Sequence, residues 1–229
     1  MDKTQDHSAH TILAEQLGLP RWLASTDIYL VDQIVRGKLD RYTRVLDGGC
    51  GAGRNMIGLA KAGLSVRAVD RDQALVLKAR EALAAAGCRV GPGSVSQANV
   101  DALPFDDASF DLVICSAVLH FAQDVAHFDK MVCELWRVLA PGGLLFTRLA
   151  SSIGIEGRLK APGKATGPST DDPCRRYRLP DGTDRFLVDE AKLLATTAHW
   201  NAELADPIKT TNVQGKRCMT TWCVGKPES

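Results

Sequence analysis

Residues 45–55 read Val-Leu-Asp-Gly-Gly-Cys-Gly-Ala-Gly-Arg-Asn, and this stretch decides the fold of the chain. Its apolar start is typical of a buried strand, and the glycines that follow predict a tight turn into a helix. Glycine suits a position where the backbone bends sharply or approaches a ligand, because it has no side chain. The spacing is Gly-x-Gly-x-Gly behind an acidic residue, which differs from the Gly-x-Gly-x-x-Gly turn of dinucleotide-binding proteins.

Further segments follow this turn in order. An apolar run at 64–69 ends at Asp70, where a carboxylate can accept hydrogen bonds from both hydroxyls of a ribose. Asn99-Val100-Asp101-Ala102-Leu103-Pro104-Phe105 then precedes an apolar run at 110–115. Arg137-Val138-Leu139-Ala140-Pro141-Gly142-Gly143 precedes another at 144–149.

These segments, taken in order across residues 45–149, resemble the motifs of the class I S-adenosylmethionine (SAM)-dependent methyltransferases. The resemblance implies an α/β fold: a Rossmann-like, doubly wound, seven-stranded sheet, mostly parallel, with an antiparallel C-terminal edge hairpin. It also implies an enzyme that uses SAM as its cofactor and a small molecule as the methyl acceptor. The glycine turn alone resembles the thiopurine and tellurite-resistance methyltransferases. A thiol or metalloid acceptor (S, Se, Te or As) therefore stays open, as does a non-catalytic SAM-binding protein.

The resemblance places the cofactor at the carboxyl ends of the strands, where open α/β sheets bind their ligands. The residues expected to bind SAM are Asp47, Gly49, Cys50, Gly51, Gly53, Asp70, Arg71, Asn99, Val100 and Ser116. Asn99 stands where the family usually has an aspartate that faces the adenine amine. An amide can serve there, because its oxygen accepts from the amine while its nitrogen donates to a ring nitrogen. The alternative is that Asn99 only caps the following turn.

Substrate choice is expected to reside in the segments that cover the cofactor. Residues 1–40 are predicted to form an N-terminal helical cap, and residues 41–229 a single methyltransferase domain with a lid loop at 150–184. A loop of that length in a compact domain is usually functional or disordered. The residues expected to contact the substrate or close over it are Trp22, Tyr29, Arg148, Arg175, Arg176 and Arg178. The alternative is that the aromatic residues pack the cap onto the sheet and the arginines are solvated.

His120 is the candidate general base, because the pKa of a histidine suits proton removal near neutrality. A soft nucleophile such as a thiolate would need no base, since proximity and alignment supply most of the rate.

The apolar periodicity predicts helices and strands in alternation, as a parallel sheet requires. The predicted helices are 11–18, 28–35, 53–62, 72–87, 123–139 and 188–198. The predicted strands are 43–47, 64–70, 95–99, 110–115, 144–149, 207–213 and 217–224. Residues 150–184 are expected to be the longest irregular region.

Composition limits the kinds of partner. The 28 basic and 27 acidic residues give a net charge of +1, which provides no electrostatic footprint for nucleic acid. No apolar run approaches the ~20 residues that span a membrane, and residues 1–7 lack the apolar core of a signal peptide. A cytoplasmic protein with a small-molecule substrate is therefore expected, and its oligomeric state is left open. The 7 cysteines include no Cys-x-x-Cys pair, so we expect neither a disulfide framework nor a metal site.

Overall fold

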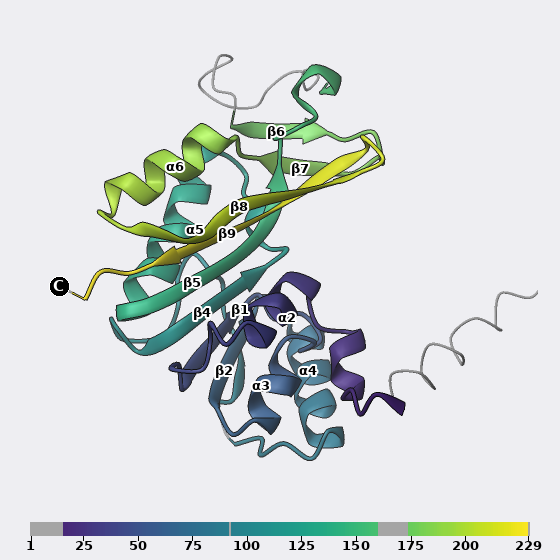
Figure 1. Cartoon of the computed structure of the whole chain (residues 1–229), viewed down its shortest axis with the longest axis vertical. Coiled ribbons are helices and arrows are strands. Elements are labelled where there is room, and N and C mark those ends of the chain that lie inside the picture. Colours follow the sequence, from purple (N-terminus) through teal and green to yellow (C-terminus); the bar gives the residue numbers. More distant parts are fainter. Residues whose placement is uncertain (1–15, 92, 160–173, 229) are drawn as a thin grey trace, which may run out of the picture.

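The computed structural model describes residues 16–91, 93–159 and 174–228. A 7-stranded sheet in the order β3-β2-β1-β4-β5-β9-β8 forms its centre (Figure 1). The parallel strands are β1 (Arg44–Gly48), β2 (Ser65–Asp70), β3 (Val95–Gln97), β4 (Phe110–Ser116) and β5 (Leu139–Ser151). The strands β8 (Glu203–Val213) and β9 (Arg217–Gly225) add an antiparallel hairpin at the β5 edge. The predicted doubly wound fold with its C-terminal hairpin is confirmed.

Helices cover both faces of the sheet (Figure 1). One face carries α2 (Ile28–Val35), α3 (Met56–Lys61) and α4 (Gln73–Ala85). The other carries α5 (Val125–Val138) and α6 (Glu190–His199). The described residues also form three short 3-10 helices: η1 (Arg21–Ala24), η2 (Leu119–Phe121) and η3 (Glu156–Arg158).

Aspartates begin most of the longer helices. The side chains of Asp27, Asp72, Asp124 and Asp189 each accept a hydrogen bond from a backbone N–H in the first turn of α2, α4, α5 and α6. Such N-caps satisfy N–H groups that have no partner inside the helix.

Two apolar clusters hold the layers together. On one face, Leu30 of α2 packs in a cluster with Val45 of β1. On the other face, Phe128 and Leu135 of α5 belong to a cluster with Leu46, the next residue of the same strand. Successive side chains of a strand point to opposite faces, so β1 is buried on both sides, as strands of parallel sheets usually are.

The main error of the sequence prediction concerns residues 150–184. β6 (Arg175–Arg178) lies within this stretch, and it forms a separate two-stranded antiparallel sheet with β7 (Asp184–Leu187), which begins at the last residue of the stretch. The sequence Arg-Arg-Tyr-Arg reads as a polar loop, yet pairing with β7 and burial of Tyr177 and Phe186 make it a strand. Residues 160–173 and most of the predicted helix at 11–18 lie outside the described residues.

Among the residues that the structure describes, no helix is long and apolar enough to cross a membrane. The same described residues contain no group of three or more His, Cys, Asp or Glu side chains placed to hold a metal ion. Free thiols, most of them buried, are found at Cys50, Cys88, Cys115, Cys133, Cys218 and Cys223.

Candidate active site

A cavity of about 570 Å³ opens at the carboxyl ends of β1, β2 and β4. Four short segments form most of its wall, namely 49–52, 70–72, 98–101 and 116–118. The chain crosses from β1 to β2 on one side and later to β4 on the other, so the cavity lies at the switch point of the sheet. The remaining lining residues are Arg54, Asn55, Leu75, Phe121, His127 and Met131.

The glycine turn has positive φ at Gly49, Gly51 and Gly53, with values of 77°, 56° and 85°. A Cβ on Gly49 would lie 2.4 Å from the Val118 side chain, and a Cβ on Gly53 would lie 3.2 Å from that of Ala79 in α4. A Cβ on Gly51 would meet no atom within 4 Å. Packing against Val118 therefore requires glycine at position 49, and a Cβ at position 53 would make a tight contact with α4. Gly51 borders open space at the cavity wall.

Asp70 ties the glycine turn to the end of β2. Its carboxylate accepts the backbone N–H of Gly51 at 2.8 Å and that of Asp72 at 3.0 Å. A carboxylate offers about four lone-pair sites. Capacity therefore remains for two further donors from the cavity, such as the hydroxyls of a ribose.

Asp47 lies beneath the turn at the end of β1 and is 1% exposed. Neither carboxylate oxygen has a hydrogen-bond partner among the described residues. Burial raises the pKa of Asp47 to about 7; the charge of Arg54 lowers it and that of Asp70 adds to the rise. A buried charge without partners is costly, and a cationic ligand group above the turn would compensate it.

The structure brings most of the other expected cofactor residues to the same cavity: Cys50, Arg71, Asn99, Val100 and Ser116. Burial raises the pKa of the Cys50 thiol, so this side chain is protonated and unreactive at neutral pH. The turn after Asn99 is closed by its main chain, since the Asn99 carbonyl accepts the N–H of Ala102 at 3.1 Å.

His120 is not at the cavity wall. It is 6% exposed, and its Nδ1 accepts the backbone N–H of Ala150 at 3.3 Å. Burial, and then the charges of Arg185 and Arg217, lower the pKa of His120 to about 4. The geometry does not support the prediction that His120 is a general base, because a base must reach the proton that it removes.

Trp22 also lies away from this cavity. Its ring packs on α3, where a Cβ on Gly58 would come within 2.5 Å of it, and it lines a separate pocket with Pro20 and Ile57. Trp22 therefore packs the N-terminal segment onto the core rather than covering the glycine turn.

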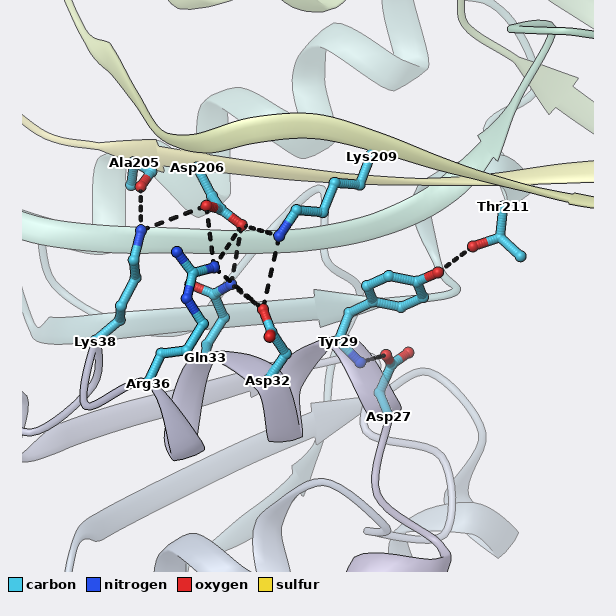
Figure 2. A network of polar contacts seen from close by, with 10 residues as sticks. All are labelled: Asp27, Tyr29, Asp32, Gln33, Arg36, Lys38, Ala205, Asp206, Lys209 and Thr211. Carbon is cyan, nitrogen blue, oxygen red and sulfur yellow. Dashed lines mark hydrogen bonds and ion pairs between the residues drawn. The ribbon is translucent and has the colours of Figure 1, made fainter.

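Tyr29 lies against Arg148, which pairs in β5 with Ser116 at the end of β4. The Arg148 guanidinium is 5.0 Å from the centre of the Tyr29 ring, and the Tyr29 hydroxyl hydrogen-bonds the hydroxyl of Thr211 in β8 (Figure 2). The N-terminal segment is thus joined to β5 and β8.

The arginines of β6 do not line the cavity in the part of the chain that the structure describes. Arg176 donates to the carbonyl of Ala122 at 3.0 Å, Arg178 pairs with Asp184 at 3.0 Å, and Arg175 lies 5.3 Å from the ring of Tyr177.

The hairpin of β6 and β7 reaches the cavity through Arg185. Its guanidinium is 5.0 Å from the ring of Phe121, and Arg71 is 5.6 Å from the same ring. Phe121 is 38% exposed and lines the cavity, so it connects the hairpin to the end of β2. The sequence did not indicate Phe121, because a single aromatic residue in a short 3-10 turn carries no motif.

Asp27, like Phe121, lies beside the site although the sequence did not indicate it. An aspartate directly before a helix indicates only an N-cap. The Asp27 carboxylate accepts the Ser116 hydroxyl at 2.8 Å and lies 3.7 Å from the Arg54 guanidinium. Both of these partners line the cavity.

Residues 46–147 match a family described as "Methyltransferase domain". An uncharacterised protein of Haemophilus influenzae is 35% identical over 146 residues, which is 61% of this chain and 57% of that protein. An uncharacterised methyltransferase of Bacillus subtilis is 34% identical over 118 residues (52% and 45%). A malonyl-[acyl-carrier protein] O-methyltransferase of Erwinia billingiae is 37% identical over 109 residues (47% and 39%). The chain spans about half the length of the curated relatives that it matches.

Solved structures share the fold over nearly the whole chain. A SAM-dependent methyltransferase of Methanosarcina mazei is 22% identical, with a TM-score of 0.68 over 86% of this chain and 98% of that one. The 1,6-didemethyltoxoflavin-N1-methyltransferase of Burkholderia thailandensis, solved with 1,6-didemethyltoxoflavin and S-adenosylhomocysteine, is 18% identical. Its TM-score is 0.61 over 96% of this chain and 86% of that one. At these identities the likeness is one of fold.

Proposed function

We propose that this protein, whose residues 46–147 form a class I SAM-dependent methyltransferase domain, transfers the methyl group of SAM to a small-molecule acceptor. The observation that carries the proposal is the cavity at the switch point of the sheet. One wall holds the open backbone at Gly51 and the partly used carboxylate of Asp70, and the unpartnered carboxylate of Asp47 lies beneath it.

The side chains around the cavity have the chemical groups that SAM needs, at positions where SAM could reach them. Asp70 would accept the ribose hydroxyls, Asn99 and Val100 would flank the adenine, and Asp47 would face the ammonium of the amino-acid tail. The open backbone at Gly51 leaves room for that tail. Each of these groups belongs to the same cavity wall or lies directly beneath it.

The catalytic contribution of the chain is binding and orientation. When bound, SAM would supply an electrophilic methyl group on its sulfonium: the acceptor atom would attack the methyl carbon in line with the carbon–sulfur bond, and S-adenosylhomocysteine would leave. Alignment of the two reactants supplies much of the rate in such a displacement. Val118, Phe121 and Met131 give the cavity apolar wall near β4, which would exclude water from the reacting atoms.

The cysteines of the cavity limit the kinds of acceptor atom that the protein could methylate. Among the described cavity-lining residues the only cysteine is Cys50, and burial keeps its thiol protonated. An acceptor held by several converging thiolates, as arsenite would be, therefore has little support. Oxygen, nitrogen, sulfur, selenium and tellurium acceptors remain, with a non-catalytic SAM-binding protein as the second candidate.

The test has two stages. Isothermal titration with SAM measures binding, and release of S-adenosylhomocysteine is then assayed with a panel of oxygen, nitrogen and sulfur nucleophiles. The panel should include malonyl-acyl carrier protein, because the name of the Erwinia relative specifies it. Binding of SAM with turnover of at least one free small molecule supports the proposal, whereas turnover of malonyl-acyl carrier protein alone would show that the acceptor is bound to a carrier protein. Absence of SAM binding would overturn it, and binding without turnover across the panel would favour the non-catalytic alternative.

A further inference from the structure

Asp27 lies outside the matched domain of residues 46–147, yet its side chain contacts two residues that line the cavity. The carboxylate is completely buried (0% exposed) at the N-terminus of α2. One oxygen, Oδ1, accepts the N–H of Tyr29 at 3.0 Å and so performs the capping role. The other oxygen, Oδ2, faces three side chains from the methyltransferase core.

Those three side chains are Ser116, Arg148 and Arg54. The Ser116 hydroxyl donates to Asp27 Oδ2 at 2.8 Å, Arg148 Nη1 donates at 3.4 Å, and Arg54 Nη2 lies at 3.7 Å. Two guanidinium groups therefore share the one buried carboxylate of Asp27. A capping role alone would need none of the three contacts.

The contact between Asp27 and Ser116 determines how the Ser116 hydroxyl can hydrogen-bond to a ligand in the cavity. Because the Ser116 proton points to Asp27, the lone pairs of the Ser116 oxygen are left to accept a donor. Arg54 carries five N–H donors, and its side chain is 47% exposed and lines the cavity. The wall thus presents an acceptor and a cation close together.

The main chain around Asp27 holds Arg54 from a second direction. The backbone N–H of Asp27 donates to Asn55 Oδ1 at 3.0 Å. The Thr26 hydroxyl, whose shorter hydrogen bond goes to the carbonyl of Trp22 at 2.9 Å, lies 3.3 Å from the carbonyl of Arg54. Residues 26 and 27 therefore fix the two residues that follow the glycine turn.

An α-amino acid has the complementary groups, a carboxylate for Arg54 and an ammonium for the Ser116 oxygen and the unpartnered Asp47. We infer that Asp27 is a positioning residue, which holds Arg54 and Ser116 so that they bind the amino-acid end of SAM. The inference rests on the proposed function, and it assigns the N-terminal segment a part in cofactor binding.

The experiment compares two ligands that differ only at that end. S-Adenosylhomocysteine carries the amino acid, and 5′-methylthioadenosine lacks it but keeps the nucleoside. Both are titrated calorimetrically into the wild-type protein and the Asp27→Asn variant. Asparagine keeps the size and the capping ability of aspartate but removes the charge that faces Arg54.

Asp206→Asn is the matched control, because Asp206 is also a buried aspartate that ties down α2. Figure 2 shows Gln33, Arg36, Lys38 and Lys209 converging on it, and none of these lines the cavity in the described part of the chain. A role of Asp27 that consisted only in docking α2 would make the two variants behave alike.

We expect Asp27→Asn to weaken S-adenosylhomocysteine by about tenfold or more, as when a hydrogen bond to a charged group is lost, and to leave 5′-methylthioadenosine unchanged. Asp206→Asn should change neither dissociation constant. An equal loss for both ligands in Asp27→Asn, the same loss in Asp206→Asn, or no change in Asp27→Asn overturns the inference. If the wild-type protein binds neither SAM nor S-adenosylhomocysteine, the proposed function itself fails.

A second variant keeps the test valid if Asp27→Asn folds poorly. Arg54→Gln alters an exposed side chain, and it should show the same selective loss of S-adenosylhomocysteine. The double variant Asp27→Asn/Arg54→Gln should lose less than the product of the two single losses, because the residues act through one contact. Fully additive losses would show that Asp27 does not act through Arg54.

Discussion

Asp70 illustrates how one side chain serves both the fold and the site. It holds the N–H groups of Gly51 and Asp72, and it faces the cavity with its remaining lone pairs. We expect Asp70→Ala to weaken SAM binding by about 1.5–3 kcal/mol, the range for hydrogen bonds to a charged group. Isothermal titration measures this loss, and an unchanged dissociation constant would remove Asp70 from the site.

Gly51 is a residue where a side chain would extend into open space at the cavity wall rather than against the protein. Gly51→Val should abolish SAM binding while the protein stays folded, because the valine would fill the open space beside the turn. Gly63→Val is the matched control: Gly63 also has positive φ and open space around its Cβ, but it follows α3 away from the cavity. Calorimetry measures SAM binding by the two variants, and circular dichroism checks that both are folded. Normal SAM binding by Gly51→Val would show that residues 49–53 form a turn with a structural role only.

Asp47 makes the stability of the folded protein depend on pH. Its pKa in the folded protein is about 7, whereas that of an unfolded aspartate is about 4. The folded state therefore favours the protonated form, and the wild-type protein loses stability as pH rises from about 4 to about 7.

Asp47→Asn should accordingly raise the free energy of unfolding at about pH 8, by up to about 4 kcal/mol, and change it little near pH 4. It should also weaken SAM, since the amide cannot balance an ammonium. Urea unfolding at both pH values and calorimetry check the two effects. A variant that is less stable than the wild-type protein at pH 8 would contradict the burial argument.

At the scale of elements, the segments around the cavity differ in how they are held. Tyr29 near the start of α2 is tied to β8, whereas the hairpin of β6 and β7 reaches the rim of the cavity through Arg185 and Phe121. We expect bound SAM to slow hydrogen exchange in α2 and in this hairpin, because the ligand favours the arrangement that makes additional contacts with it. Exchange rates in the outer turns of α4 provide an internal control. Identical exchange rates in α2 and the hairpin with and without SAM would contradict the idea that these segments close over the ligand.

At the scale of the whole molecule, Asp206 joins the first described α-helix to the last strands. Burial alone would raise its pKa, but hydrogen bonds from Lys209 and Arg36 outweigh burial and lower the pKa to about 2. A lowered pKa contributes stability above the pKa of about 4 in the unfolded chain, and this stability is lost as pH falls toward about 2.

Asp206→Asn should therefore lower the free energy of unfolding near neutral pH by on the order of 1–2 kcal/mol, a value reduced by the solvent exposure of Arg36 and Lys209. The difference from the wild-type protein should shrink as the pH falls from about 4 to about 2. Urea unfolding across this range measures it. A difference that grows in acid would show that the charge network does not stabilise the molecule.

The sequence by itself determined the sheet and the edge of the sheet at which the candidate site lies. Strand and turn signals are local, and the carboxyl ends of parallel strands must meet at one edge, so the sequence alone places Asp70, Asn99 and Ser116 at a common site. The glycine spacing also predicted the tight turn at this edge, because glycine readily adopts the positive φ found at these positions.

Only the tertiary structure decided which side chains outside these motifs reach the cavity or its lining residues. Asp27 meets Ser116 across 89 positions of sequence, while His120, next to the end of β4, turns into the core. Phe121 and Arg185 meet only because β7 folds back over η2. Such contacts depend on how whole elements pack against one another. Packing of this kind leaves no local sequence pattern, so the sequence does not show that a capping aspartate or a single aromatic residue also contacts the site.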